Sequence, residues 1–196
     1  RPFPERKLWK VRQVRGVASA EPMAKGWAQV KLKSGSTETV MIVGVDPSAG
    51  LGLPWRFREG SLTDLKVDKT IMIDESAIAR LDGLGRGDTV EIAETAVKVV
   101  GISEDVRSFT TFPTVFANYE TAKRLARVYR VTGSDQVTFI LVNVAPGHAI
   151  SDVVERLRAV GGVDVYASEE FSRKTRRYWI VRTGMGIGFG AVALLG

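Results

Sequence analysis

The sequence predicts an α+β fold with three parts: a discontinuous α/β subdomain formed by residues 1–45 and 136–182, a small β-rich subdomain inserted at 46–135, and residues 183–196, which begin a membrane helix. Three observations support this prediction. Helix and strand patterns flank a middle part that is dominated by short strands. A loop rich in glycine and proline separates the first part from the middle, and the last part carries no charge.

Composition limits the domain count and the chemistry. The chain has 196 residues, of which 44% are hydrophobic, and this suits one large or two small folded domains. Because it has no cysteine, disulfide frameworks, thiolate metal sites and cysteine nucleophiles are excluded. With a single histidine, neither a multi-histidine metal site nor a serine–histidine pair is expected.

The first part predicts a helix followed by a β-hairpin. Residues 5–15 predict a short amphipathic helix, because apolar side chains recur at roughly helical spacing between cations. Gly16 ends this helix, and Val17–Leu32 predicts a strand. A tight turn at Ser34-Gly35 then leads into the returning strand Thr39–Val45.

The inserted part begins with residues 46–60, whose glycines and prolines predict a loop and a domain boundary. Short strands and two helices follow. The predicted strands are Thr70–Ile73, Thr89–Ile92, Ala96–Ile102 and Thr114–Ala117, and the predicted helices are Glu75–Leu81 and Tyr119–Val128, the second capped by Asn118.

The chain after the insert contains its strongest strand pattern. The predicted elements are a strand at Gln136–Val144, a helix at Ala149–Val160 and a strand at Val163–Ala167. Ser168 is predicted to cap a last helix, in whose first turn Glu169 and Glu170 are favourable.

This last helix runs without a breaker into the uncharged stretch Thr183–Gly196. Its alternating glycines form two overlapping G-x-x-x-G pairs, which permit close helix packing in a membrane but destabilise a soluble helix. Tyr178 and Trp179 precede the stretch, where interfacial aromatic side chains belong. Since a bilayer requires about 20 apolar residues, we expect these residues to start a membrane helix. A buried core helix is the alternative.

The net charge of +6 is concentrated at the chain ends. Residues 1–15 hold six basic side chains and one acidic, and residues 168–196 hold five basic and two acidic. A protein that binds nucleic acid usually spreads its basic side chains over one folded face. Two basic ends instead suit one anionic lipid surface, with two solvated Lys/Arg-rich helices as the alternative.

No motif predicts a catalytic, cofactor or metal site. The glycines within residues 83–87 follow a helix and precede a strand, which is the wrong order for a phosphate-binding loop. The adjacent carboxylates Asp74 and Glu75 point apart on a strand, and His148 lies in a turn without a second histidine. We therefore expect this chain not to be an enzyme.

Several large aromatic side chains fall in predicted loops or next to them, among them Phe57 and Phe116. Such side chains either fill a small core or face a partner. Trp55, Phe109 and Phe112 are the candidate partner contacts.

A series of short motifs runs through the chain in a fixed order: R-G-V at 15–17, V-G-V-D-P at 43–47, R-E-G at 58–60, D-E-S at 74–76, G-D at 87–88, K-V-V-G-I at 98–102, E-F at 170–171, Y-W at 178–179 and T-G-M-G-I-G-F at 183–189. Together they resemble the periplasmic core domain of MacB/FtsX-like ABC transporter permeases over essentially the whole chain. The closing segment is most similar to the DevC-type exporter branch.

The resemblance implies a permease with four membrane helices and this domain between the first two, on the periplasmic side of a bacterial inner membrane. The discontinuous subdomain would be the membrane-proximal, Porter-like part. The insert would be the Sabre-like part, which docks a periplasmic adaptor (membrane fusion) protein. The basic flank of the last helix departs from this topology, because positive charge normally marks the cytoplasmic side.

The resemblance also implies partners and a mechanism of efflux. ATP would bind to a separate ABC ATPase subunit or domain, so this chain would hold no cofactor. Other expected partners are a second permease copy, the lipid membrane and an outer-membrane channel reached through the adaptor, but no nucleic acid. The helix that transmits movement would include Phe171, Tyr178, Trp179 and Arg182. The alternative is a membrane-anchored sensor domain that binds a ligand or lipoprotein and has no transport role.

Overall fold

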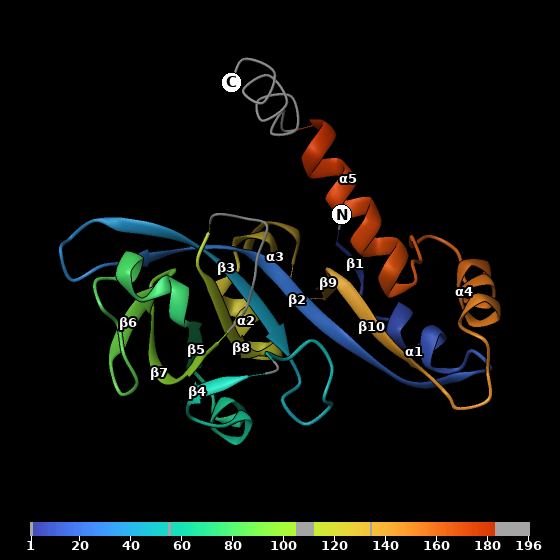
Figure 1. The fold of residues 1–196 in the computed structure, drawn as a ribbon, viewed down its shortest axis with the longest axis horizontal. Helices are drawn as coiled ribbons and strands as arrows, with labels where there is room; N and C mark the ends of the chain where they lie inside the picture. Colours follow the sequence, from blue (N-terminus) through green and yellow to red (C-terminus); the bar gives the residue numbers. More distant parts are fainter. Residues whose placement is uncertain (1, 55, 105–111, 134, 183–196) are drawn as a thin grey trace, which may run out of the picture. The chain divides into compact units, whose positions relative to one another are not determined.

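The structure is a computed structural model that describes residues 2–54, 56–104, 112–133 and 135–182 (Figure 1). The chain forms two compact units. Unit 1 comprises Arg1–Arg12 with Ser19–Asn143, and unit 2 comprises Gln13–Ala18 with Val144–Gly196.

Strands dominate unit 1, whereas the two longest α-helices lie in unit 2. The strands are β1 (Phe3–Pro4), β2 (Val17–Lys31), β3 (Thr37–Val45), β4 (Phe57–Glu59), β5 (Thr70–Asp74), β6 (Thr89–Ile92), β7 (Thr95–Ser103), β8 (Thr114–Asn118), β9 (Gln136–Val137) and β10 (Phe139–Val144). The α-helices are α1 (Lys7–Arg12), α2 (Tyr119–Leu125), α3 (Arg127–Thr132), α4 (Ile150–Ala159) and α5 (Ser168–Arg182). The 3₁₀ helices are η1 (Leu62–Lys66), η2 (Glu75–Ala77) and η3 (Ala79–Leu81).

Among the described residues, one mixed eight-stranded sheet organises unit 1. Its strand order is β10-β2-β3-β8-β5-β7-β4, and β6 pairs with both β2 and β7. The hairpin β2–β3 is antiparallel, β3–β8 and β5–β7 are parallel, and β5–β8 is antiparallel. A separate antiparallel pair joins β1 to β9, which fixes the N-terminal strand to unit 1.

The centre of the sheet is buried on both faces. Successive side chains on a strand point to opposite faces, and on β3 Val40 and Ile42 belong to the larger core while Met41 and Val43 belong to a second, smaller one. Figure 1 shows α2 and α3 on the same side of the sheet, and their buried side chains belong to the larger core.

Close contact between α2 and β3 requires small residues. A Cβ on Gly44 would lie 2.1 Å from the Cβ of Ala122 and 3.2 Å from that of Ala24. A Cβ on Gly26 would likewise lie 2.9 Å from the Cβ of Ala126. The small residues on this face of β2 and β3 therefore let the helices pack directly on the strands.

Unit 2 is built around α4 and the chain reversal before it. Val153 and Leu157 form the buried side of α4, four residues apart as an amphipathic helix requires. Gly16 adopts a φ of +93°, and a Cβ there would lie 2.7 Å from Val153. Its carbonyl accepts a hydrogen bond of 2.8 Å from the backbone N–H of Ala145.

Most predicted elements are confirmed, with three corrections in the insert. The loop at 46–60 contains the short strand β4, and the predicted helix Glu75–Leu81 is two 3₁₀ turns, η2 and η3. The helix Tyr119–Val128 is interrupted at Ala126, whose extended backbone (φ −77°, ψ 122°) separates α2 from α3.

The strand predicted at Gln136–Val144 is divided at Thr138. Its hydroxyl donates to the carbonyl of Met23 at 2.8 Å and accepts from the backbone N–H of Lys25 at 2.7 Å. At Thr138, which separates β9 from β10, the side chain bonds to the backbone of β2.

The prediction of a strand at Val163–Ala167 is wrong, because these residues form a loop. Gly161 and Gly162 both adopt positive φ values and turn the chain. The carbonyl of Val165 accepts hydrogen bonds from the Arg158 guanidinium instead of from a neighbouring strand.

The two compact units do not follow the predicted division at 45/46 and 135/136. β3 from the first segment pairs with β8 from the insert, and β2 pairs with β6, so both segments contribute to one sheet. Hydrogen bonding between distant segments sets this organisation. The assignment of Porter-like and Sabre-like parts stays a prediction.

Within the part of the chain that the structure describes, no helix is long and apolar enough to cross a membrane. Thr183–Gly196 lie outside the described residues. The predicted membrane helix therefore stays a prediction.

Candidate functional site

The first two turns of α5 are fastened within unit 2 by side chains from α4 and the preceding loop. The helix begins at Ser168 itself, since the N–H of Phe171 bonds to the carbonyl of Ala167 at 2.9 Å. Ala167, rather than the predicted Ser168, therefore holds the cap position. Glu169 and Glu170 occupy the first turn, where negative charge interacts favourably with the helix dipole.

Arg158, near the end of α4, connects three segments. Its Nη2 and Nε donate to the carbonyl of Val165 at 3.2 and 3.4 Å, and Nη2 lies 3.3 Å from the carboxylate of Glu170. One guanidinium thus joins α4, the loop at 161–167 and α5. Because the ion pair between Arg158 and Glu170 is half exposed, it adds little to the stability of the fold. Its main effect is to fix the positions of the three segments.

The second turn of α5 is held through Tyr166. Lys174 Nζ donates a hydrogen bond to the Tyr166 hydroxyl and lies 4.3 Å from the centre of its ring. This hydrogen bond raises the pKa of Lys174 above its ordinary value. The ring of Phe171, which is 45% exposed, lies 6.1 Å from that of Tyr166. We call Arg158, Tyr166, Glu170, Phe171 and Lys174 the α5 root.

A second candidate site is an exposed aromatic pair on unit 1. Trp27 on β2 and Phe112 ahead of β8 are 43% and 37% exposed, and their ring centres lie 4.6 Å apart at 62°. Register explains the pairing. Trp27 lies opposite Met41 on β3, and the N–H of Met41 bonds to the carbonyl of Pro113 at 2.8 Å.

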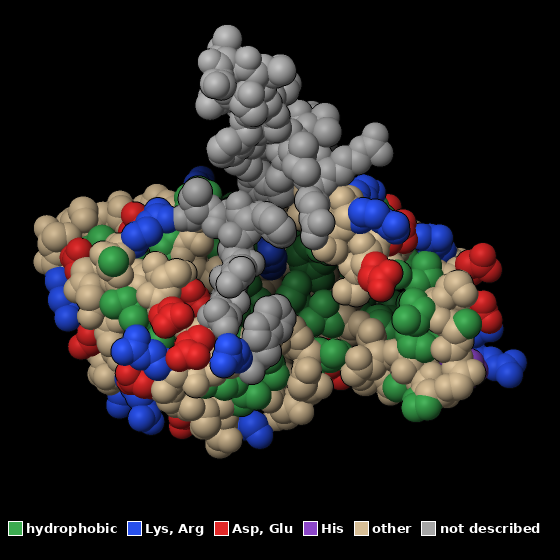
Figure 2. Space-filling view, in the orientation of Figure 1, with side chains coloured by type: hydrophobic (Ala, Val, Ile, Leu, Met, Phe, Trp, Pro, Cys, Tyr) green, Lys and Arg blue, Asp and Glu red, His purple; other side chains and the backbone are tan. Residues whose placement is uncertain are grey.

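Lys25 lies two residues before Trp27 and therefore on the same face of β2. Burial lowers the pKa of its amine. Figure 2 shows hydrophobic side chains gathered over the middle of β2 and beside β10. The aromatic pair thus shares its face of β2 with a partly desolvated cation, and we call Lys25, Trp27 and Phe112 the aromatic surface.

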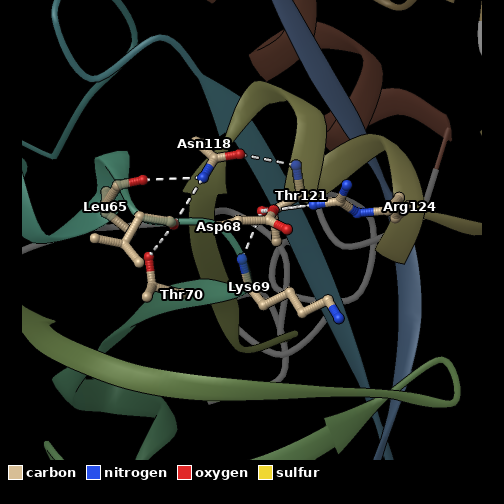
Figure 3. Close-up of polar contacts among 8 residues, drawn as sticks. Leu65, Asp68, Lys69, Thr70, Asn118, Thr121 and Arg124 are labelled. Atoms are coloured by element: carbon tan, nitrogen blue, oxygen red, sulfur yellow. Dashed lines mark hydrogen bonds and ion pairs between the residues drawn. The ribbon is translucent and has the colours of Figure 1, made fainter.

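A polar cluster beside α2 has a structural role (Figure 3). Asn118 caps α2 as predicted, its Oδ1 accepting from the N–H of Thr121 at 2.8 Å. Its Nδ2 donates to the carbonyls of Leu65 and Val67, both at 3.0 Å. One amide thus joins the start of α2 to the segment before β5.

Asp68 completes this cluster by accepting from the Thr121 hydroxyl at 3.0 Å and pairing with Arg124. Burial alone raises the pKa of the Asp68 carboxyl. The Thr121 hydrogen bond and the Arg124 charge outweigh that effect, so the pKa is lowered. Every polar group named in the cluster has a protein partner, which indicates a structural clamp.

Among the described residues, no group of three or more His, Cys, Asp or Glu side chains is placed to hold a metal ion. The expectation that this chain has no catalytic site and no cofactor stays a prediction.

Comparison with known proteins decides the family. The family described as the MacB-like periplasmic core domain matches residues 1–160. The chain belongs to this family. It is thus a periplasmic-type domain of the ABC transporter permease family.

Relatives of this MacB-like domain include uncharacterized ABC transporter permeases from two strains of Mycobacterium tuberculosis. Each is 29% identical over 180 residues, a match that covers 85% of this chain and 47% of the relative. The chain therefore spans about half the length of the curated relatives it matches.

Solved structures show the same mixed α+β fold. The periplasmic region of MacB from Actinobacillus actinomycetemcomitans has a TM-score of 0.60 at 15% identity, covering 89% of this chain and 83% of that one. The extracellular domain of YknZ from Gram-positive bacteria has a TM-score of 0.58 at 13% identity, covering 81% and 82%.

The predicted site residues of this MacB-like domain are only partly described. Phe112 is 37% exposed, so it stays a candidate partner contact, whereas Trp55 and Phe109 lie outside the described residues. Of the other loop aromatics, Phe57 packs against the smaller core and Phe116 belongs to it.

On α5, Phe171 is exposed, and the side chains of Tyr178, Trp179 and Arg182 lie outside what the structure describes. Sequence reasoning missed Trp27. The strand pattern could have revealed it. Trp27 shares one face of β2 with the polar residues Lys25, Gln29 and Lys31, whereas the other face holds small apolar residues, and this alternation indicates that Trp27 lies on the outer face. The α5 root gave no sequence signal beyond its charges.

Proposed function

We propose that this MacB-like domain transmits movement of the membrane helices to an extracytoplasmic partner, driven by ATP hydrolysis on an ABC ATPase. The transmitting element is α5. A helix rises 1.5 Å per residue, so the 15 residues of α5 span about 22 Å. Tilting one end of such a rod must move the other end.

The observation that carries the proposal is the α5 root. Glu170, Phe171 and Lys174 lie within four residues of one another, on neighbouring turns of one helix face. Their partners are Arg158 and Tyr166. A rod that is fastened at its base transmits a rotation to the unit that holds it, whereas a loosely attached rod does not.

The aromatic surface is the proposed contact for the periplasmic adaptor protein. Binding energy at protein interfaces concentrates in a few side chains, with Trp prominent among them. Trp27 is already packed edge-on against Phe112, and its partial exposure leaves apolar area for a partner to cover. The partly buried amine of Lys25 beside it favours a partner that presents a carboxylate or carbonyl oxygen.

The remaining partners follow from the permease family and complete the proposal. They are the ABC ATPase, a second permease copy, the lipid bilayer of the inner membrane, and an outer-membrane channel reached through the adaptor. The transport direction would be efflux. We further assign the chain to the DevC-type branch, on the basis of its closing segment.

Distance measurement between the two units tests the coupling. Spin labels are attached through Ser36→Cys on unit 1 and Glu155→Cys on unit 2, both exposed positions, after any cysteine elsewhere in the permease and its ATPase has been replaced. Pulsed electron spin resonance is recorded on the whole permease with its ATPase in nanodiscs. We expect the distance distribution to change between the nucleotide-free and the ATP–vanadate states.

The control pair carries both labels on unit 1, through Ser36→Cys and Lys66→Cys, and its distances should not change. An unchanged distribution for the pair across the units contradicts the coupling and favours the alternative, a membrane-anchored sensor domain. A change in both pairs points to deformation of unit 1 and also contradicts the proposal.

Adaptor docking is tested by titrating the assembled permease with a candidate periplasmic adaptor protein. Trp27→Ala should weaken binding roughly ten-fold, as loss of a central aromatic contact does. Val131→Ala is the matched control, because Val131 is another exposed apolar side chain of unit 1. Equal effects of the two variants exclude the aromatic surface as the docking site.

A further inference from the structure

The helix α1 has one buried and one exposed face. Leu8 and Val11, three residues apart, are each only 5% exposed, as one side of an amphipathic helix requires. Trp9 lies on the other side and is 65% exposed. A tryptophan that presents this much of its ring to water gains little from folding, since burial of aromatic area is what stabilises it.

The ring of Trp9 has a cation beside it. The guanidinium of Arg12 lies 5.5 Å from the ring centre. The same guanidinium donates to the carbonyl of Ala20 at 2.9 Å and pairs with Glu21 at 3.0 Å. Arg12 therefore fastens α1 to the first residues of β2 in unit 1 and supports the indole from one side.

Further basic residues lie close to Trp9 in the sequence. Arg6 and Lys10 lie three residues before and one residue after Trp9, and both are exposed. The one acidic side chain among residues 1–15, Glu5, is engaged by Lys123 at 3.2 Å. The exposed face of α1 thus combines a large amphipathic ring with positive charge.

We propose that this face, formed by Arg6, Trp9 and Lys10, binds the anionic headgroup region of a phospholipid surface. Indole rings favour the boundary between headgroups and acyl chains, where the apolar body is buried and the N–H stays hydrated. Arg and Lys next to the ring are attracted to phosphate and to anionic lipids. Unit 1 would then have its own contact with the membrane plane, separate from α5, and this contact does not rest on the proposed coupling.

The test uses the cysteine-free chain with one environment-sensitive fluorophore, attached through Lys10→Cys. The probes are vesicles of pure phosphatidylcholine and vesicles with 30% phosphatidylglycerol. We expect a blue shift of the emission with the anionic vesicles that weakens as salt is raised, and little change with the neutral ones. The control label at Ser36→Cys, on the turn after β2, should stay in water with both kinds of vesicle.

Substitutions at two positions of the labelled chain separate the effect of charge from that of the aromatic ring. Arg6→Gln should raise the lipid concentration at half-maximal shift about five-fold, the effect of removing one basic side chain near an anionic surface, and Arg6→Lys should restore it. Trp9→Ala should reduce the blue shift itself. Neither position is buried, so all three variants should fold, as circular dichroism can verify.

Three results overturn the proposal. The label at position 10 can stay in water while sedimentation shows the chain bound to anionic vesicles, which would place the contact elsewhere. The shift can be equal with neutral and anionic vesicles, which would remove the headgroup charge from the interaction. The label can also be shielded only in the assembled permease in neutral lipid, which would make a protein the occupant of this face.

Discussion

Glu5 and Lys123 form an ion pair of 3.2 Å in which the lysine side chain is only 9% exposed. The pair joins the residue that follows β1 to the middle of α2, across 118 positions of sequence. The backbone N–H of Glu5 also bonds to the carbonyl of Asp135 at 2.8 Å. The N-terminal strand is thereby fixed to unit 1 by its backbone and by a buried charge.

Glu5→Gln should destabilise the chain by about 1–3 kcal/mol, because it leaves a mostly buried ammonium without its strongest partner. The remaining carboxylate, Glu120, lies 3.9 Å away and is largely exposed. The free energy of unfolding in urea measures the effect. Glu38→Gln, which breaks an exposed pair with Arg80, is the matched control and should cost less than about 1 kcal/mol. Equal losses would show that burial of Lys123 does not matter.

The raised pKa of Tyr119 predicts that the free energy of unfolding falls at alkaline pH. Burial, with the nearby Glu5 carboxylate adding to it, raises the pKa of Tyr119 well above the ordinary 10.0. Above about pH 10 the unfolded chain releases this proton while the folded chain keeps it, so the free energy of unfolding must fall as the pH rises.

Tyr119→Phe should therefore flatten the fall in stability above pH 10 and change the stability at pH 7 only slightly. The hydroxyl that it removes is buried without a hydrogen-bond partner among the described residues. Some fall should remain, because burial also raises the pKa of Tyr129. Urea unfolding at pH 7, 9 and 10.5 checks this. An unaltered pH profile in the variant would show that Tyr119 does not cause the fall.

Gly44→Ala should destabilise unit 1 by about 1–3 kcal/mol or more, the range for inserting a carbon into a packed core. The new Cβ would stand 2.1 Å from the Cβ of Ala122, so α2 must move off β3. Thermal unfolding followed by circular dichroism measures the loss. The matched control is Gly85→Ala, since no atom lies within 4 Å of a Cβ at that position. Similar melting temperatures for both variants would contradict the packing argument.

The sequence was informative wherever a structure depends on neighbouring residues. The cap of α2 by Asn118 could be predicted because its acceptor and donor are three residues apart. The aromatic surface could not be predicted, because Trp27 and Phe112 meet only through the pairing of β3 with β8. The division of the last strand has the same cause, since Thr138 bonds to residues more than 100 positions away.

The failed strand at Val163–Ala167 shows how a side chain can replace a neighbouring strand. Its alternating apolar residues satisfied the pattern for a strand, but Arg158 supplies the hydrogen bonds that Val165 would otherwise accept from a neighbour. No local pattern reveals that a guanidinium seven residues earlier will reach this carbonyl. The same guanidinium belongs to the α5 root, and so does Tyr166 from the misread segment, so the segment wrongly predicted as a strand is part of the candidate site.

Proline at position 176 tests whether the stiffness of α5 matters. Arg176 lies in α5 after the last residue of the α5 root. Proline there removes one backbone donor and clashes with the carbonyl four residues before it, which costs a helix about 3 kcal/mol. In the whole permease with its ATPase, Arg176→Pro should abolish the ATP-dependent change in distance between labels at Ser36 and Glu155. Basal ATP hydrolysis and assembly should persist.

Arg176→Ala removes the same side chain but keeps the helix, so it should retain the ATP-dependent change in distance. Loss of the change in both variants would assign the effect to the arginine rather than to helix stiffness. If Arg176→Pro retains the full change, movement does not pass along α5. The N-terminal strand, fixed to unit 1 through Glu5 and Lys123, would then be the connection to test next.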